Sequence, residues 1–169
     1  MAAAASRIFP NDDSGPGACE AGVAIYIDRQ LAGPYGRDRY RYTQEPFEEA
    51  APEFGYQGKP TPREVYKEGL KSLKGFARLS TNEQDKSLQQ IESSRFFLLL
   101  RQHTIEGMFS DPLHGGNKDM IGWQLIGFPG SRMSYYDDID THYGEAFRPK
   151  PVSLAKVTGS RIRPSEEKK

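Results

Sequence analysis

The chain has 169 residues, 36% of them hydrophobic, and its 23 Lys and Arg residues balance 23 Asp and Glu residues. This length suits one domain with a real core, and the neutral charge lacks the electropositive field that drives binding to nucleic acid or anionic membranes. The single cysteine, Cys19, excludes an internal disulfide, and no apolar run reaches the ~18 residues of a membrane-spanning helix.

The chain begins with Met1 followed by four alanines. A run of small residues is what remains around a signal-peptidase cleavage site. We therefore expect residues 1–6 to be a disordered remnant of an N-terminal export segment.

The first predicted helix covers residues 17–32. Ser14-Gly15-Pro16 supplies a capping residue and an early proline, and Gly33-Pro34 is a typical helix end. Between these signals Val23, Ile27 and Leu31 recur at helical spacing, so one face should lie against the core.

Residues 33–60 show no helical period but are rich in aromatic residues. Connections longer than ~12–15 residues are generally functional or disordered, and the aromatic content argues against disorder. Two interpretations stay open: the rings cover the domain's own core, or they bind a partner, because Tyr and Arg dominate interface energetics. Stacking on nucleic acid needs an electropositive groove, which nearby acids would cancel. The rings belong to Tyr35, Tyr40, Tyr42, Phe47, Phe54 and Tyr56.

Three further helices are predicted from their capping residues. Thr61 to Glu64 is a capping box with proline at the first helical position, and Ser80 to Glu83 repeats the signal before a short surface helix. Ser93 or Ser94 should cap the next helix, in which residues 96–100 are all apolar. Apolar residues on every face are typical of a helix buried from several sides, so we expect this to be the central core helix.

Residues 106–130, EGMFSDPLHGGNKDMIGWQLIGFPG, contain six glycines and the only tryptophan of the chain. Such glycine density indicates positive φ angles or close backbone approach. Core packing is the first explanation for Trp123. However, Gly122 and Gly127 leave bare backbone beside it, and Trp is enriched in binding hot spots, so this segment is predicted to be a docking surface.

The same segment contains the best candidates for catalysis. His114 with Asp111 or Asp119 could serve as an acid/base pair in a standalone lyase or hydrolase. The sequence has no zinc-protease motif, nucleophile elbow or dinucleotide-binding fingerprint. In the structural alternative, His114 and Asn117 hydrogen-bond loop carbonyls while Gly115 and Gly116 supply positive φ.

After residue 130 the chain has little periodicity but keeps aromatic residues, including Tyr135 and Tyr136. So long a tail on a small core suggests an arm that wraps around the chain itself or around another subunit. Residues 158–169 are expected to form a charged, frayed end.

These residues together resemble a known family. The segment 106–130 looks like the signature of the gluconate 2-dehydrogenase subunit 3 family. In order along the chain, Pro10-Asn11-Asp12, residues 15–18, residues 21–36, Phe54 to Gln57 before Thr61-Pro62, and Pro151 to Leu154 are similar to it as well. The resemblance covers roughly residues 7–157.

The resemblance implies an accessory role. In such complexes a large subunit similar to glucose-methanol-choline oxidoreductases holds FAD and oxidises gluconate, sorbitol, fructose or a glucoside, and a cytochrome c subunit or another acceptor takes the electrons. The small subunit holds no cofactor or metal, stabilises the large one, and typically carries the twin-arginine signal that exports both to the periplasm. No twin-arginine pair occurs in this sequence, and the family often has Tyr at the position of His114.

We therefore expect a mainly α-helical single domain, residues 7–157, with about four to five helices, a long aromatic loop and a C-terminal arm. Its expected function is that of a non-catalytic small subunit that binds an FAD-dependent dehydrogenase. The expected partner-binding residues are Tyr35, Tyr40, Tyr42, Phe54, Tyr56, His114, Gly115, Gly116, Asn117, Trp123, Phe128, Tyr135 and Tyr136.

Overall fold

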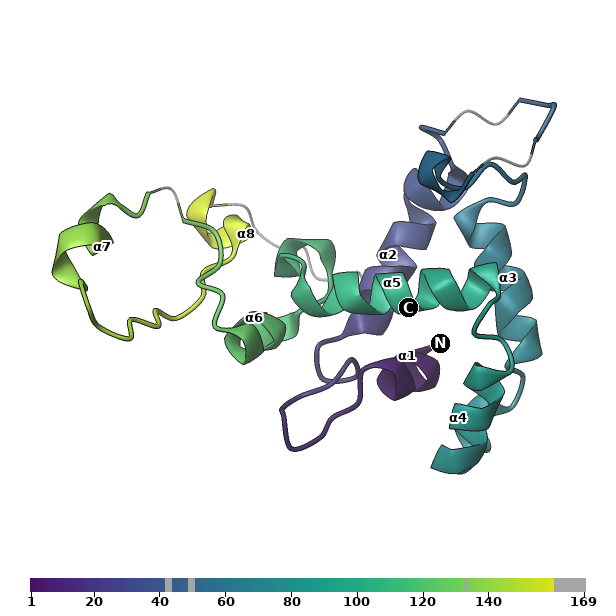
Figure 1. Cartoon of the computed structure of the whole chain (residues 1–169), viewed down its shortest axis with the longest axis horizontal. Coiled ribbons are helices and arrows are strands. Elements are labelled where there is room, and N and C mark those ends of the chain that lie inside the picture. Colours follow the sequence, from purple (N-terminus) through teal and green to yellow (C-terminus); the bar gives the residue numbers. More distant parts are fainter. Residues whose placement is uncertain (42–43, 49–50, 133, 160–169) are drawn as a thin grey trace, which may run out of the picture.

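A computed structural model of the chain describes residues 1–41, 44–48, 51–132 and 134–159. Over these residues the chain is mainly helical and has no β-strand, as the sequence predicts (Figure 1). No helix in the described ranges is long and apolar enough to span a membrane. The α-helices are α1 (Ala2–Ile8), α2 (Val23–Ala32), α3 (Pro62–Ser72), α4 (Thr81–Gln89), α5 (Arg95–Phe109), α6 (Ile121–Ile126), α7 (Tyr136–Thr141) and α8 (Leu154–Val157). Short 3₁₀ helices are η1 (Tyr35–Arg37), η2 (Pro52–Phe54), η3 (Phe76–Arg78), η4 (Pro112–His114) and η5 (Lys118–Met120).

Helix α5 is the centre of the fold. It packs against α1, α2, α3 and α6, and the hydroxyl of Ser94 caps it by accepting a hydrogen bond from the Phe97 amide at 3.1 Å. The prediction of a central helix capped by serine is confirmed. The helix is not covered on every side, however, because Leu98 is 50% exposed whereas Leu100 is completely buried.

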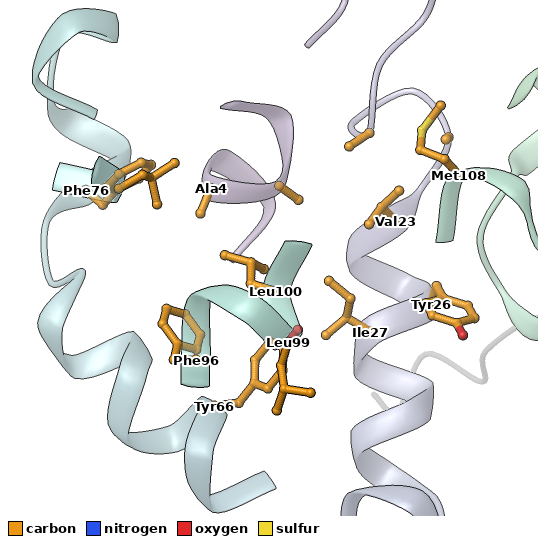
Figure 2. Close-up of a cluster of buried hydrophobic side chains, with 14 residues drawn as sticks. Ala4, Val23, Tyr26, Ile27, Tyr66, Phe76, Phe96, Leu99, Leu100 and Met108 are labelled. Atoms are coloured by element: carbon orange, nitrogen blue, oxygen red, sulfur yellow. The ribbon is translucent and has the colours of Figure 1, made fainter. Parts of the chain in front are cut away.

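The hydrophobic core lies between α5 and the helices around it. Figure 2 shows Ile27 of α2 facing Leu99 and Leu100 of α5, with Phe96 and Tyr66 beside them. The rings of Tyr66 and Phe96 meet edge to face, with their centroids 5.4 Å apart, a favoured geometry for aromatic pairs. The helical face predicted from Val23 and Ile27 is therefore a core face.

The N-terminal residues are ordered, contrary to the expectation for residues 1–6. Ala4 and Ala5 of α1 are fully buried, and α1 contacts α4 and α5. Small side chains allow its backbone to approach its neighbours closely. The Arg7 guanidinium also pairs with the Asp85 carboxylate of α4 at 2.8 Å. The alanine run is thus part of the helical body.

Helix α2 begins at Val23, six residues later than predicted. Ser14 does not cap a helix; its amide instead donates to the Asp12 carboxylate in a turn. Gly22, with φ of 68°, gives the left-handed residue from which α2 starts. Local turn formation therefore overrides the helix-start signal at Ser14-Gly15-Pro16.

The two capping boxes form as predicted. At the start of α3 the Thr61 hydroxyl accepts from the Glu64 amide, and the Glu64 carboxylate accepts from the Thr61 amide. Ser80 and Glu83 make the equivalent pair at the start of α4. These local signals hold because they depend on residues only three positions apart.

Two leucines of α5 provide a matched test of this packing. Leu100→Ala should lower the free energy of unfolding by about 2–5 kcal/mol, because it removes buried methyl groups and leaves a cavity. Leu98→Ala should cost much less, because this side chain is half exposed. Urea unfolding followed by circular dichroism measures both values. Equal losses would contradict the placement of α5 in the core.

Candidate partner-binding surface

The glycine-rich junction, residues 110–122, is the loop that seats α6 against the end of α5. Its anchor is Asn117, which is completely buried. The Asn117 amide donates to the Gly107 carbonyl at 2.7 Å, and its side-chain Nδ2 donates to the Ser110 carbonyl at 2.9 Å. Its Oδ1 accepts from the Gly122 amide, also at 2.9 Å. One side chain thus joins the end of α5 to the start of α6.

Two glycines allow this close approach. A Cβ at Gly116 would lie 2.2 Å from the Gly107 carbonyl oxygen, and one at Gly122 would lie 1.9 Å from that of Met108. These contacts are with backbone atoms, which cannot move aside as a flexible side chain can. The prediction of close backbone approach is confirmed, but the neighbour is α5 of the same chain.

Trp123 supports this junction from inside. Its side chain is only 4% exposed, and its Nε1 donates to the Phe109 carbonyl at 2.6 Å. Phe128 packs edge to face on its ring, with centroids 5.1 Å apart, and remains exposed. The expectation that Trp123, Gly116 and Asn117 themselves contact a partner is corrected: all three are buried within the chain, and they shape the surface from below.

The structure does not join His114, Asp111 and Asp119 into a catalytic group. His114 and Asp119 are exposed, and within the described residues no side-chain hydrogen bond or ion pair links the His114 imidazole to either carboxylate; the His114 backbone amide donates to the Asp111 backbone carbonyl at 2.9 Å. Both carboxylate oxygens of Asp111 instead accept backbone amides, from Leu113 at 2.9 Å and from Leu154 at 2.6 Å. Asp111 therefore caps η4 and holds the start of α8.

The structure also gathers no metal-binding group. No cluster of three or more His, Cys, Asp or Glu side chains occurs among the residues that it describes.

The aromatic loop, residues 33–60, is fixed to the core by a buried histidine. His103 of α5 is 1% exposed. Its Nε2 lies 2.9 Å from the Tyr35 hydroxyl and its Nδ1 lies 2.9 Å from the Tyr66 hydroxyl. A neutral imidazole has one donor and one acceptor nitrogen, so one tyrosine accepts and the other donates. This Tyr35–His103–Tyr66 bridge joins η1, α5 and α3.

Burial controls the electrostatics of the bridge. Desolvation lowers the pKa of His103, because the charged imidazolium loses its hydration, although the nearby Glu106 carboxylate opposes this effect. Burial raises the pKa of the Tyr35 hydroxyl, and the negative charge of Glu106 raises it further. Tyr26 donates to Glu106 at 2.9 Å. Near neutral pH the bridge is therefore an uncharged hydrogen-bonded chain.

Further along the aromatic loop, some rings are held and others project into solvent. The half-buried Tyr56 ring has the Arg95 guanidinium carbon 4.4 Å and that of Arg41 5.1 Å from its centroid, in cation–π contacts. Tyr40 and Phe54 are strongly exposed. The two interpretations of this loop therefore apply to different residues: Tyr35 and Tyr56 are anchored to the body, whereas Tyr40 and Phe54 are available to a partner. Tyr42 lies outside the described residues.

The C-terminal arm, residues 131–152, leaves the helical body and returns to it. The Ser131 amide donates to the Val152 carbonyl at 2.7 Å, and the Val152 amide donates to the Pro129 carbonyl at 3.2 Å. Gly130, with φ of 78°, makes this crossing possible, because a Cβ there would lie 2.2 Å from the Val152 oxygen. Figure 1 shows the arm projecting from the helices, with α7 at its far side. Tyr135 and Tyr136, predicted to bind a partner, are exposed on it.

Sequence reasoning missed three residues of these surfaces. His103 carried a signal, because it follows Phe96, Leu99 and Leu100 at helical spacing and a polar residue on a buried face needs partners. Ile139 and Tyr143 are exposed on the arm, and nothing in their local pattern distinguishes them from residues that fold back on the core.

Gly116→Ala tests the seating of the glycine-rich junction. The added methyl group would meet the Gly107 carbonyl, so the free energy of unfolding should fall by roughly 1–3 kcal/mol, as in other overpacked sites. Gly33→Ala is the control, because Gly33 has φ of −78° and its nearest contact is 3.3 Å away. Thermal unfolding of both variants measures the difference. A Gly116→Ala protein as stable as wild type would show that the loop is not tightly seated.

His103 predicts a pH-dependent stability. Its folded pKa lies below the usual 6.5, so between these values the unfolded chain binds a proton that the folded chain does not. Stability should therefore fall as the pH drops below about 6.5, by at most about 1.4 kcal/mol per pH unit from this group.

His103→Gln should remove this component, whereas His114→Gln, which replaces an exposed histidine, should retain the wild-type profile. Urea unfolding at pH 7.5, 6.5 and 5.5 compares the three proteins. Parallel profiles for wild type and His103→Gln would contradict this assignment.

Comparison with known proteins gives one family. The family model described as gluconate 2-dehydrogenase subunit 3 matches residues 1–130. The match begins at α1, earlier than the resemblance drawn from motifs, and ends at Gly130, where the arm begins. Searches of curated proteins and of solved structures found no match.

Proposed function

The chain belongs to the gluconate 2-dehydrogenase subunit 3 family, an accessory subunit of a dehydrogenase complex. From this membership we propose that it is the non-catalytic small subunit that binds and stabilises an FAD-dependent large subunit of the glucose-methanol-choline type. The substrate of the complex is a sugar, a polyol, a sugar acid or a glucoside.

The observation that supports this proposal best is where the exposed aromatic residues lie. Tyr40 and Phe54 project from the aromatic loop, and Tyr136 and Tyr143 project from the arm. Large exposed apolar surfaces on a soluble protein mark interaction sites, and Tyr is common in their energetic centres. Both segments are anchored to the helical body, which makes them suitable for holding a partner in a defined geometry.

In the proposed complex the cofactors belong to other subunits. The large subunit holds FAD and takes the hydride from the substrate, and a cytochrome c subunit with haem c, or another acceptor, receives the electrons. This chain contributes contacts that favour the folded large subunit. Anything that binds only the folded state stabilises it in proportion to the logarithm of its concentration over Kd.

The proposed location is the periplasm, reached together with the folded large subunit through twin-arginine export. This part of the proposal rests on the family resemblance. A standalone acid/base enzyme is less well supported, because the Asp111 carboxylate is engaged by two backbone amides and the His114 imidazole makes no hydrogen bond to it.

Co-expression tests the proposed role. A co-expressed flavoprotein dehydrogenase of the glucose-methanol-choline type should bind this chain in a pull-down. Saturating amounts of the chain, about 100 times Kd, should stabilise the large subunit by about 2.7 kcal/mol, measured as a rise in its Tm. Without the chain, the yield of soluble, FAD-loaded large subunit should fall.

His114→Ala is the matched control for catalysis, and it should leave sugar oxidation by the complex unchanged. The proposal would be overturned if the purified single chain oxidised or cleaved a sugar substrate and His114→Ala abolished that activity. Absence of binding to the flavoprotein would also overturn it.

A further inference from the structure

We propose that the tip of the C-terminal arm, residues 134–147, is a docking element that enters an apolar groove edged by Lys or Arg on the dehydrogenase large subunit. This inference rests on the proposed function, and it commits to one surface and one partner. Four features support it: the arm's closed base, its internal order, its outward aromatic residues and the acidic character of its tip.

The base of the arm is closed by backbone hydrogen bonds. Ser131 and Val152 are joined directly, and the Leu154 amide just beyond is held by Asp111. Ser153 and Ala155 are buried against the body. The arm is therefore a loop with both ends fixed, so the entropy of closing it has already been lost before it meets a partner.

The described part of the arm is also ordered internally. Arg132 pairs with the Asp138 carboxylate, and its guanidinium carbon lies 5.0 Å from the centroid of the Tyr135 ring. The rings of His142 and Phe147 stack with centroids 3.7 Å apart. These contacts tie α7 to both sides of the loop. A preorganised loop needs less ordering on binding than a flexible tail does.

The aromatic and aliphatic side chains of the arm that make none of these contacts indicate that the partner is a protein surface. Tyr136 is 80% exposed, Tyr143 is 91% exposed, and Ile139 is also strongly exposed. Between residues 134 and 147 the sequence has four acidic residues and no Lys or Arg, whereas basic residues flank this segment and Arg132 pairs with one of the acids, Asp138. An acidic, aromatic tip fits an apolar groove with cationic edges and is repelled by anionic lipid headgroups.

A second copy of this chain is the less favourable partner. Between α3 and the start of α5 lies a groove of about 1030 Å³, lined by Val65, Phe96 and several lysines. However, two of its three lysines are already paired, Lys59 with Glu45 at 3.2 Å and Lys71 with Glu68 at 2.6 Å. Arm-to-groove contacts would also join two different surfaces, and such contacts give open chains unless the rotation closes a ring.

The extent of the family match also separates the arm from the body. The match ends at Gly130, and the whole arm follows it. The helical body therefore carries the features that the family model describes. The arm, with exposed rings and a fixed base, is suited to recognising the particular large subunit that this chain serves.

The test measures binding of the complete chain to its flavoprotein large subunit. Tyr136→Ser and Tyr143→Ser should each raise Kd by on the order of 30-fold, the effect of losing an interface hot spot. Leu98→Ser is the control, because it also removes an exposed apolar side chain but lies on α5 of the body. Circular dichroism should show unchanged folding for all three variants.

A second variant removes the arm without disturbing its base. Replacing residues 132–150 by a short Gly-Ser linker joins Ser131 to Pro151, whose neighbour Val152 already bonds to Ser131. This variant should keep the Tm of the body and lose binding to the large subunit. Asp140→Asn with Glu145→Gln should reduce the dependence of Kd on NaCl concentration.

The outcomes separate the two proposals. If wild type binds the large subunit and the arm variants bind equally well, the arm inference is overturned and the proposed function stands. If wild type does not bind, the proposed function fails. If the arm variants abolish only concentration-dependent self-association in sedimentation, the arm joins copies of this chain, and the inference is overturned.

Discussion

The structure depends on the seating of the glycine-rich junction on the last turns of α5. Asn117 bonds to Gly107, Ser110 and Gly122, and Gly116 and Gly122 bring backbone to backbone. This contact sets the position of α6 and so places Trp123, beside which Gly130 crosses the returning Val152. Asp111, in the same junction, holds the start of α8. The geometry of the arm's base therefore depends on the close packing of the glycine-rich junction against α5.

A second anchor works at the side of the body. The Tyr35–His103–Tyr66 bridge ties the beginning of the aromatic loop to α5 and α3. Because His103 is buried, leaving either ring nitrogen without a partner would cost free energy. The bridge therefore holds η1 in place while Tyr40 and Phe54, later in the loop, remain exposed. Both projecting segments are thus held at the root by polar contacts and carry apolar side chains beyond it.

This design suits a subunit that acts by contact. Asp111, the carboxylate closest in sequence to His114, caps backbone amides. Family membership gives the class of complex, and the exposed rings indicate where this chain could meet its partner. The proposed division is that the large subunit performs the chemistry, while this chain supplies a rigid body with two projections that stabilise it.

The sequence alone determined the features that depend on near neighbours. The capping boxes at Thr61 and Ser80, the Ser94 cap, the central α5 and the family all follow from residues close together in the chain, because caps and helical periodicity act over three or four residues. Only the tertiary structure decided which side chains are buried and which are exposed to solvent. Trp123 and Asn117 are among the residues expected to contact a partner, yet both are buried because the backbone at the end of α5 packs against them. Residues 1–6 are expected to be disordered, yet the alanines of α1 pack against α5 because their small side chains permit it. These outcomes depend on contacts between segments far apart in sequence, which no local pattern records.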